Sequence, residues 1–417
     1  MAKDLQCIIV FLERNNSYAR KTVKYLPEII MKELSRITEI FTESVIREMT
    51  RICSAAGGYN LAQGFPDFEA PAAIKEAAIK AINENFNQYA VTFGEPELRE
   101  AISRKAYRYN NISCDPGTDI TVTCGATEAM IATLKAIINP GDEFIVFEPF
   151  YENYGPDGIL SGATPKYVTL YSPDWNYNYD ELKKAFSAKT KAIIINTPNN
   201  PTGKVFSHKE LTEIADLCIK HDVYAVTDEI YEHILYDGAR HISIASLNGM
   251  EDRTITINSI SKTYSVTGWR VGWAIASKEI TSRIRKVHDF LTVGAPNPLQ
   301  HAAASALNYP NEYYNGLQKH YNEARDFLYI LLREKGFKPG KPQGAYYMIT
   351  DISDLMHKLA VDNDTDFCRK LIDKIGVAAV PGSSFYSDPK KGCHYIRFCF
   401  CKKWETLHAV EKAFVNL

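Results

Sequence analysis

The sequence predicts an α/β fold, in which a large domain holds a mostly parallel β-sheet between helices and a smaller α+β domain follows. The first observation is that helical stretches alternate with short apolar runs from about residue 70 to 290. Most of these runs are rich in β-branched residues and continuously apolar, as strands covered by helices on both faces should be. The second observation is a change after about residue 300, where a long helical region precedes further strand patterns. Such alternation is typical of a parallel sheet between two helical layers.

The first part of the chain is predicted to be mostly irregular or helical. Residues 1–30 show no regular pattern, and Met31 offers an alternative start. From Lys32 to Ala56 the apolar residues recur on one broad face, which predicts a helix. Asn60–Phe68 then reads as a loop that ends in a turn-forming Pro-Asp pair.

The apolar runs give the expected strands. Those of the large sheet are Ile120–Thr123, Glu143–Phe147, Lys191–Asn196, Val223–Thr227, Thr254–Asn258 and Val271–Ala276. In the smaller domain we expect helix at His301–Asn308 and Tyr313–Lys335, and strands at Ala345–Ile349 and Tyr395–Phe400. The expected borders are 1–30 for an N-terminal segment, 31–60 for an N-terminal part of the smaller domain, 61–295 for the large domain and 296–417 for the small C-terminal domain.

Composition and charge limit the classes of function. Lys plus Arg is 48 and Asp plus Glu is 50, so the formal net charge is −2 and no general attraction to nucleic acid or membrane follows. The longest early apolar run, Cys7–Leu12, is shorter than a signal-peptide core, and no later run approaches a membrane span. There are nine cysteines but no C-x-x-C pair, and Cys399 and Cys401 alternate with phenylalanines as in a buried strand. We therefore expect a reducing, cytoplasmic setting.

A lysine at the end of an apolar run is the first chemical signal. Ser259-Ile260-Ser261-Lys262 closes the run, and Arg270 follows eight residues later. Burying an ammonium is costly, and a desolvated amine of low pKa is a good carbonyl-binding nucleophile. The arginine could bind a phosphate through its bidentate fork. Taken alone, a lysine in this position is more often a surface residue after a strand.

Three more motifs follow strand-like runs. Asp228 precedes Tyr231 at the end of one run, where ligands bind in open α/β sheets, although an Asp there could also be a helix N-cap. Asn200 lies in the Pro/Asn/Gly-rich stretch Asn196–Gly203, which could be a plain turn. Thr123–Ala129 is a small-residue turn before a helix, a potential phosphate cradle that is weak evidence by itself.

Together these motifs indicate one cofactor pocket. They supply, in order, a phosphate cradle, an amide, a carboxylate with a phenol, and a lysine with an arginine. No P-loop and no G-x-G-x-x-G follows any strand, which weakens nucleotide binding as an interpretation. No H-E-x-x-H and no Cys/His cluster indicates zinc, so no metal site is expected.

With these motifs, residues from about 35 to 415 resemble the class I, fold-type I, pyridoxal-phosphate-dependent aminotransferases. The resemblance is strongest to the branch that contains kynurenine, glutamine and methionine aminotransferases. Asn60–Phe68, Asn87-Gln88-Tyr89 and Tyr395-Ile396-Arg397-Phe398 carry this closer match. It implies residues 61–295 as the cofactor-binding domain.

The resemblance implies roles for the cofactor pocket. Lys262 would bind pyridoxal 5'-phosphate covalently and then move a proton between the substrate Cα and cofactor carbon C4′. Asp228 would keep the pyridine nitrogen protonated, and Tyr231 and Asn200 would bind the phenolic oxygen. Tyr151 would stack on the ring, although it could be a packed core residue. The remaining implied cofactor contacts are phosphate contacts from Gly125, Ala126, Thr127, Ser259, Arg270 and, with an assisting role, Ser261.

The resemblance also implies a homodimer with shared sites and a substrate class. Tyr89 would reach the phosphate in the neighbouring subunit. Arg397 and a close backbone approach at Gly64 would hold the substrate α-carboxylate, with Asn200 beside them, although strand arginines more often form surface salt bridges.

Members of this family that select acidic substrates carry a second cation for the distal carboxylate. One branch has a lysine at the position of Thr127, and another keeps an arginine in the stretch that corresponds to Thr292–Gln300, which contains none here. The sequence therefore favours neutral amino acids that are aromatic, sulfur-containing or amide-bearing, with a 2-oxo acid as the acceptor, and disfavours an aspartate aminotransferase.

One departure from the branch concerns the substrate pocket. Kynurenine-type members carry an aromatic pair where this chain has Val293 and Gly294, which suggests a roomier pocket. Four aromatic residues could line it, but aromatic residues on such segments more often belong to the core, so we do not predict them as site residues: Tyr346, Tyr347, Phe385 and Tyr386.

The sequence leaves one alternative open and disfavours two others. The same residues would serve a cysteine-conjugate β-lyase or a related elimination enzyme. A cofactor-binding regulator would need a DNA-binding domain before the matched region, and about 30 residues are too few for one. An inactive relative is disfavoured because every cofactor-holding position carries a suitable residue.

Overall fold

The computed structural model describes residues 32–417, so the expectations for residues 1–30, the Cys7–Leu12 run and Met31 lie outside the described residues. The chain divides into two units, 1–42 and 43–417. Within the described residues 32–42 of the first unit, the 3-10 turn η2 (Arg36–Glu39) is followed by irregular chain. The predicted helix from Lys32 is therefore wrong over its first half. Helix α2 (Val45–Ala55) begins only after Ser44, whose hydroxyl caps it by accepting from Arg47 N at 3.3 Å.

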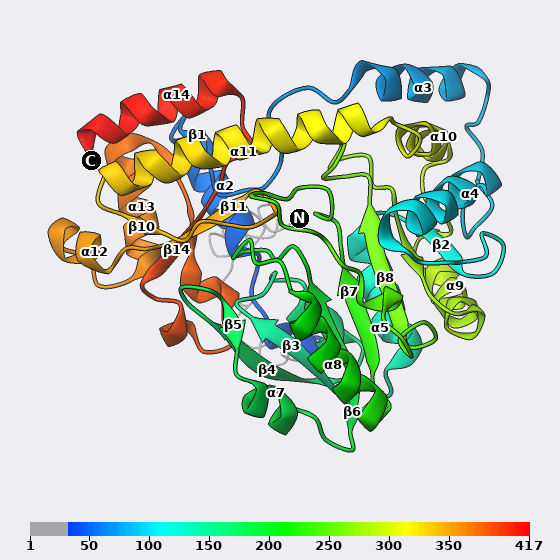
Figure 1. Ribbon diagram of the computed structural model, residues 1–417. Helices are drawn as coiled ribbons and strands as arrows, with labels where there is room; N and C mark the ends of the chain where they lie inside the picture. The colour runs from blue at the N-terminus through cyan, green and yellow to red at the C-terminus, as the bar shows by residue number, and fades with distance from the viewer. Residues whose placement is uncertain (1–31) are drawn as a thin grey trace, which may run out of the picture. The chain divides into compact units, whose positions relative to one another are not determined.

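An eight-stranded sheet forms the centre of the second unit (Figure 1). Its strand order is β2-β9-β8-β7-β6-β3-β4-β5. The strands are β2 (Ile120–Thr123), β3 (Glu143–Glu148), β4 (Thr164–Tyr171), β5 (Asn176–Tyr177), β6 (Thr190–Asn196), β7 (Tyr224–Asp228), β8 (Thr254–Ser259) and β9 (Gly272–Ile275). Strand β9 runs antiparallel to both neighbours and β5 is antiparallel to β4, whereas β8, β7, β6, β3 and β4 are parallel. The predicted mostly parallel sheet is confirmed.

Helices cover both faces of this sheet. Strand β6 shows why: Ile194 packs into the core beneath α5 and α9, whereas Ile193 and Ile195 pack into the core beneath α8. Successive residues of a strand point to opposite faces, so a strand between two helical layers must be apolar throughout. The helical elements of this region are α3 (Ala72–Asn83), α4 (Pro96–Lys105), the π-turn η3 (Ala106–Asn110), α5 (Ala126–Ile137), α6 (Tyr154–Leu160), α7 (Tyr179–Ala185), α8 (His208–His221), η4 (Ile244–Ser246), α9 (Lys278–Thr292) and α10 (Asn297–Ala306).

The C-terminal part has its own antiparallel sheet, with the order β10-β11-β14-β13. Its strands are β10 (Lys338–Pro339), β11 (Tyr347–Asp351), β13 (Val380–Pro381) and β14 (Tyr395–Cys399). Its helical elements are α11 (Asn311–Glu334), α12 (Ser353–Leu359), α13 (Asp364–Ile375), η5 (Gly382–Phe385), η6 (Pro389–Lys391), α14 (Trp404–Ala413) and η7 (Phe414–Asn416). Strand β1 (Tyr59–Asn60), after α2, pairs in parallel with β12 (Val377–Ala378). The segment after α2 thus joins the C-terminal part of the chain.

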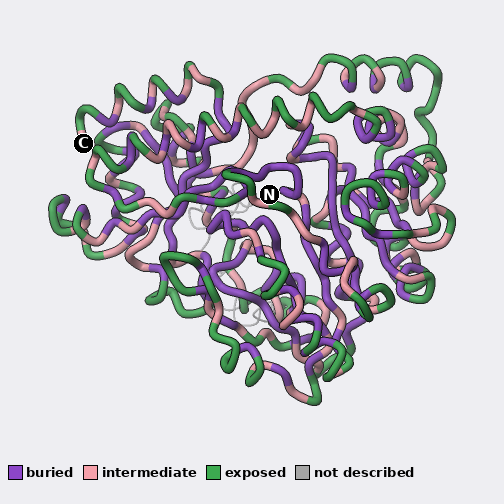
Figure 2. The backbone as a smooth tube through the Cα atoms, viewed as in Figure 1, coloured by how far each residue is buried: buried purple, intermediate pink, exposed green. Residues whose placement is uncertain are grey.

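Burial follows these two sheets. Figure 2 shows buried backbone running through the central strands and exposed backbone along the outer helices. Cys399 and Cys401 are both buried, as the sequence predicts, and every cysteine from Cys53 onward has a free thiol. Within residues 32–417, no helix combines the length and the apolar character that crossing a membrane requires.

Candidate active site

A cavity of about 470 Å³ lies where the carboxyl ends of the central strands meet the C-terminal sheet. Strands β6, β7 and β8 end beside it, and β11 and β14 contribute residues from the other sheet. The cavity brings together most of the residues singled out from the sequence. The predicted site residues on its wall are Gly64, Ala126, Thr127, Tyr151, Asn200, Asp228, Tyr231, Ser259, Ser261, Lys262, Arg270 and Arg397. Gly125 lies directly behind this wall, whereas Tyr89 does not line the cavity.

Lys262 projects into the cavity from the turn after β8. Its Nζ donates to the backbone oxygen of Gly64 at 3.1 Å and lies 5.7 Å from the ring centroid of Tyr231 and 5.6 Å from that of Tyr346. Burial is the main reason why the pKa of this lysine falls to about 8, and the nearby carboxylate of Asp228 limits the fall. A larger fraction of this amine is therefore unprotonated near neutral pH than in an ordinary lysine, which favours its use as a nucleophile and proton carrier.

Asp228 ends strand β7 and is almost fully buried. Its Oδ2 accepts from Tyr154 Oη at 2.7 Å, and its Oδ1 accepts from the backbone N–H of Ile230 at 3.3 Å. Burial raises the pKa of this carboxyl to about 6, against the effect of these hydrogen bonds. A carboxylate in this state is suited to hold a positively charged N–H group. Sequence reasoning missed Tyr154; the available signal was its spacing of three residues from Tyr151 at a helix start.

The backbone of the turn from β2 into α5 forms a cradle in which no side chain projects from Gly125. Gly125 has φ +83°, and a Cβ there would lie 2.3 Å from Arg270 Nη2. A Cβ on Gly272 would lie 2.6 Å from the backbone nitrogen of Ala126. Both glycines let Arg270 and the first N–H groups of α5 approach one another closely. An arginine and a helix start are a phosphate-binding combination, so this cradle fits the phosphate of pyridoxal phosphate.

Arg397 is fully buried at the opposite end of the cavity. Its Nη1 donates to Asn200 Oδ1 at 2.8 Å and its Nη2 donates to the backbone oxygen of Ala62 at 2.6 Å. Among the described residues, its Nε has no hydrogen-bond partner. A buried guanidinium that faces a cavity without a carboxylate partner is suited to bind an incoming carboxylate.

Tyr347, which the sequence assigned to the core, lies on the cavity wall. Its hydroxyl is 3.0 Å from that of Tyr231, and its ring centroid is 4.2 Å from Arg397 Cζ. A Cβ on Gly64 would lie 1.9 Å from its hydroxyl oxygen, so the Gly64 backbone approaches Tyr347 closely. Tyr346 is fully buried and donates to the backbone oxygen of Gly64 at 3.0 Å.

Tyr151 and Tyr89 have opposite environments. Tyr151 lies on the cavity wall, edge-to-face with Tyr154 at a centroid distance of 5.7 Å, and burial raises its pKa to about 12. Tyr89 is 86% exposed, in a loop where Gln88 O accepts from Asn297 Nδ2 at 3.2 Å. Within one copy of the chain, Tyr89 therefore contributes nothing to the cavity.

Three ligand-capable side chains cluster behind β7 and η3: Glu229, Glu232 and His241. His241 Nε2 lies 2.9 Å from Glu229 Oε2, and Lys105 forms an ion pair with Glu232. Asn110 Nδ2 donates to both carboxylates, at 3.3 and 2.7 Å. These partners bind both carboxylates in a buried polar network, whereas His241 Nδ1 is buried without a hydrogen-bond partner among the described residues.

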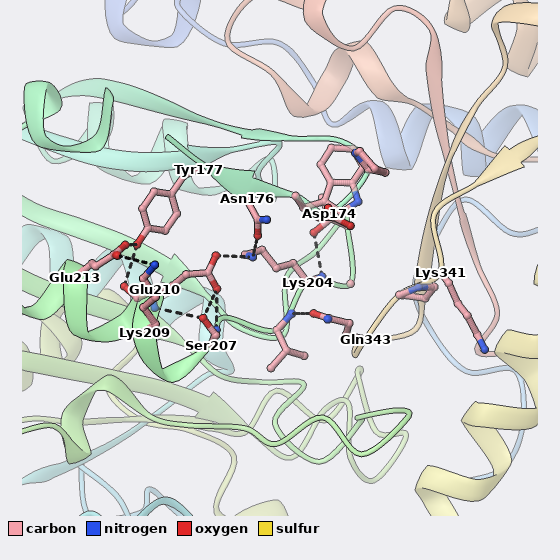
Figure 3. A pocket seen from close by; sticks show the side chains of 16 residues that line it. Asp174, Asn176, Tyr177, Lys204, Ser207, Lys209, Glu210, Glu213, Lys341 and Gln343 are labelled. Atoms are coloured by element: carbon pink, nitrogen blue, oxygen red, sulfur yellow. Dashed lines mark hydrogen bonds and ion pairs between the residues drawn. The ribbon is translucent and has the colours of Figure 1, made fainter. Parts of the chain in front are cut away.

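A second cavity, of about 580 Å³, contains none of the predicted site residues (Figure 3). It lies between β5, the start of α8 and the loop around Gln343. Lys204 donates there to Asn176 Oδ1 at 3.1 Å and pairs with Glu210 Oε1 at 2.7 Å. Tyr177 Oη donates to Glu213 Oε2 at 2.9 Å. The polar groups of this wall bind one another, which indicates a structural role.

Comparison with known proteins agrees with the geometry. Residues 56–412 match the family model "Aminotransferase class I and II". The chain is 39% identical to kynurenine–oxoglutarate transaminase 3 of Rattus norvegicus, over 92% of this chain and 90% of that protein. Among solved structures, N-succinyldiaminopimelate aminotransferase of Mycobacterium tuberculosis is 36% identical with a TM-score of 0.87, over 93% of this chain and 100% of that one.

An Escherichia coli protein in which a methionine aminotransferase function was identified is 34% identical with a TM-score of 0.87, over 93% of this chain and 100% of that one. These relatives are aminotransferases, so the β-lyase alternative is not favoured. The extent of the family match and the level of identity show that the chain belongs to the class I and II aminotransferases, and it is a pyridoxal-phosphate-dependent enzyme.

Proposed function

We propose that this aminotransferase moves the amino group of a neutral L-amino acid to a 2-oxo acid by a ping-pong reaction in the cavity around Lys262. Aromatic, sulfur-containing and amide-bearing donors are the expected class. The observation that carries the proposal is the placement of Arg397, buried and open to the cavity, in the same cavity as the lysine and the carboxylate of Asp228. When the substrate carboxylate is bound at Arg397, the Cα of the amino acid would face Lys262.

Most of the groups proposed to hold the cofactor lie on this cavity, and Tyr89 would come from a second copy. Pyridoxal phosphate supplies an electron sink for the pair of electrons released at the substrate Cα. Gly125, Ala126, Thr127, Ser259 and Ser261 would hold its phosphate together with Arg270, and Tyr151 would cover one face of its ring. Tyr231 and Asn200 would bind its phenolic oxygen. The cradle that a Cβ at Gly125 would fill supports the phosphate end of this arrangement.

Lys262 and Asp228 would divide the proton handling. With its pKa lowered to about 8, the Lys262 amine can take a proton from the substrate Cα and return it at the neighbouring cofactor carbon. Asp228 would keep a proton on the pyridine nitrogen. The positive charge of the protonated ring would then pair with the buried carboxylate. Tyr154 donates to the same carboxylate and would fix its orientation.

Arg397 and Gly64 would place the substrate. The guanidinium can present two N–H groups to the α-carboxylate, and the ring of Tyr347 stacks against it at 4.2 Å. The backbone at Gly64 holds no side chain between Lys262 and this anchor, because a Cβ would clash with Tyr347. Both substrates of a ping-pong reaction carry a carboxylate beside the reacting carbon, so one anchor serves both half-reactions.

We further propose a homodimer with shared sites and a cytoplasmic location. Apolar side chains are exposed around the loop with Tyr89 and the end of α9: Phe86 is 38%, Val91 42%, Phe290 91% and Val293 47% exposed. His288 Nε2 lies 2.7 Å from Thr92 O, which ties this loop to α9 beside the phosphate cradle. A second copy could cover this surface and bring Tyr89 to its phosphate. The free thiols support a reducing compartment.

The domain borders from the sequence are also proposed, with residues 61–295 as the cofactor-binding domain, and 31–60 with 296–417 as the smaller domain. The pairing of β1 with β12 supports the second grouping.

Steady-state kinetics test the proposed function. Methionine, glutamine, phenylalanine and kynurenine should each be tried as donors against several 2-oxo acids with the holoenzyme. The expected result is parallel lines in double-reciprocal plots and a second product that is the oxo acid of the donor. Release of ammonia and pyruvate from a cysteine conjugate, without dependence on an oxo acid, would contradict the proposal.

A further inference from the structure

Four cationic side chains line the active-site cavity, among the described residues, and one of them has no role so far. Lys262, Arg270 and Arg397 serve the reacting carbon, the phosphate and the α-carboxylate in the proposed function. The fourth is Arg47, in the first turn of α2. It is exposed, and its guanidinium forms no hydrogen bond or salt bridge with any residue of the described part of the chain.

Arg47 affects which substrate side chains the cavity can bind. The sequence disfavours acidic substrates because position 127 is threonine and Thr292–Gln300 contains no arginine. Arg47 lies outside both stretches, on a helix that reaches the cavity from the N-terminal side. A second carboxylate-binding group is therefore present in the cavity, in a place that those two positions do not reveal.

An exposed arginine suits a ping-pong enzyme because both substrates use the same cavity in turn. When a substrate with a distal carboxylate is bound, the guanidinium can form a charge-assisted pair with it. When the side chain is neutral, the guanidinium can stay in water at no desolvation cost. A buried, permanently paired cation could not serve both cases.

From these observations we infer that Arg47 binds the distal carboxylate of a dicarboxylic 2-oxo acid, with 2-oxoglutarate as the representative acceptor. The inference rests on the proposed function and deepens it: neutral amino acids donate the amino group, and the acceptor carries the second carboxylate. The printed name of the rat relative includes oxoglutarate, but the inference depends on the placement of Arg47 in this chain.

Negative charges on the same wall limit the effect. Glu152 lines the cavity, and its carboxylate accepts a hydrogen bond from the Ser44 hydroxyl at the start of α2. Asp157 lies deeper, and its Oδ2 is buried without a hydrogen-bond partner among the described residues. A dicarboxylic substrate must therefore be attracted by Arg47 against Glu152. Substitutions at these two residues should change the preference in opposite directions.

The test compares two acceptors in the holoenzyme. The quantity is the ratio of kcat/KM for 2-oxoglutarate to kcat/KM for 2-oxo-4-methylthiobutanoate, whose side chain is neutral, with phenylalanine as the common donor. Arg47→Gln should lower this ratio about fivefold, the upper range for one exposed ion pair. Arg47→Lys should restore part of it, and Glu152→Gln should raise it. Added salt should lower the wild-type ratio, because an exposed pair is screened.

Arg51→Gln is the matched control. Arg51 lies one turn further along α2, pairs with Glu43 and does not line the cavity. Its substitution removes the same charge from the same helix and should leave the ratio within about twofold of the wild type. A merely structural role of Arg47 would lower both kcat/KM values together and leave their ratio unchanged.

The two possible failures are distinguishable. An unchanged ratio in Arg47→Gln, or an equal loss in Arg51→Gln, overturns the inference while turnover with the neutral acceptor still supports the proposed function. Wild-type enzyme that uses the neutral acceptor but rejects 2-oxoglutarate also overturns the inference alone. Wild-type holoenzyme without turnover of any donor and acceptor pair overturns both.

Discussion

Substitution of Gly125 by alanine tests whether the turn before α5 holds the cofactor phosphate. The residue has φ +83° and ψ 169°, a backbone conformation that essentially only glycine adopts. An added Cβ would lie 2.3 Å from Arg270 Nη2 and 2.7 Å from its Cζ, so the guanidinium must move. Losing one charge-assisted hydrogen bond costs about 1.5–3 kcal/mol. We therefore expect pyridoxal phosphate to bind about 10- to 150-fold more weakly.

The assay is titration of the apoenzyme with pyridoxal phosphate, followed by the cofactor absorption band. Gly141→Ala is the matched control: it also has a positive φ, of +94°, but an added Cβ would meet nothing within 4 Å. The control should show the backbone cost of about 1–3 kcal/mol as a lower unfolding temperature, with unchanged cofactor affinity. Wild-type affinity in Gly125→Ala, or an equal loss in Gly141→Ala, would refute the reasoning.

Three further predictions concern titratable groups. Burial raises the pKa of Asp228 from 3.8 to about 6, so ionisation of this carboxyl above pH 6 costs the apoenzyme about 3 kcal/mol of folding free energy. Asp228→Asn should therefore stabilise the apoenzyme above pH 6. Urea unfolding should show that this gain in stability vanishes as the pH falls toward 4. Tyr154→Phe removes a hydrogen bond to ionised Asp228, so the acid limb of the kcat/KM profile should move up by about 1 pH unit; an unmoved limb would exclude this role. His288 Nδ1 lies 2.6 Å from Glu128 Oε1, and His288 Nε2 lies 2.7 Å from a backbone oxygen. The pKa of His288 is raised. The protonated histidine therefore stabilises the fold fully below the ordinary pKa of 6.5, and this stabilisation is lost as the pH rises through the raised pKa. Glu128→Gln should therefore lower the unfolding temperature more at pH 6 than at pH 9, and an equal loss at both would contradict the pair.

The central sheet was predictable because its strands are buried on both faces. For each continuously apolar run, the predicted bounds agree with those of the observed strand to within one or two residues, as for β6 and β8. Strand β4 (Thr164–Tyr171) was missed because only Val168 and Leu170 of it are buried and it has no continuous apolar run. The antiparallel direction of β9 was equally invisible, since a buried strand reads the same in either direction.

The predicted helix from Lys32 failed because periodicity alone does not locate a helix start. The apolar face continues back to Ile37, but Ser44 caps α2 and ends the helical backbone there. A capping residue within a periodic pattern competes with the pattern, and here the cap decided the boundary.

The site was predictable where chemistry follows a strand end in the sequence. Asp228, Asn200 and Lys262 each end or follow a strand, and the parallel sheet brings these ends to one edge. Tyr347 could not be separated from core aromatics, because its hydroxyl reaches the cavity only through the packing of β11 against β14. Arg47 was missed because it carries no motif, and only the fold shows that α2 reaches the cavity.

The most direct test of the central claim is chemical mapping of the cofactor attachment. The holoenzyme should be reduced with borohydride and digested, and the peptides should be analysed by mass spectrometry. We predict a pyridoxal phosphate adduct on the peptide that contains Lys262, and its absence from a Lys262→Arg variant reconstituted in the same way. An adduct on another lysine, or none after reconstitution of the wild-type protein, would contradict the assignment of this cavity as the active site.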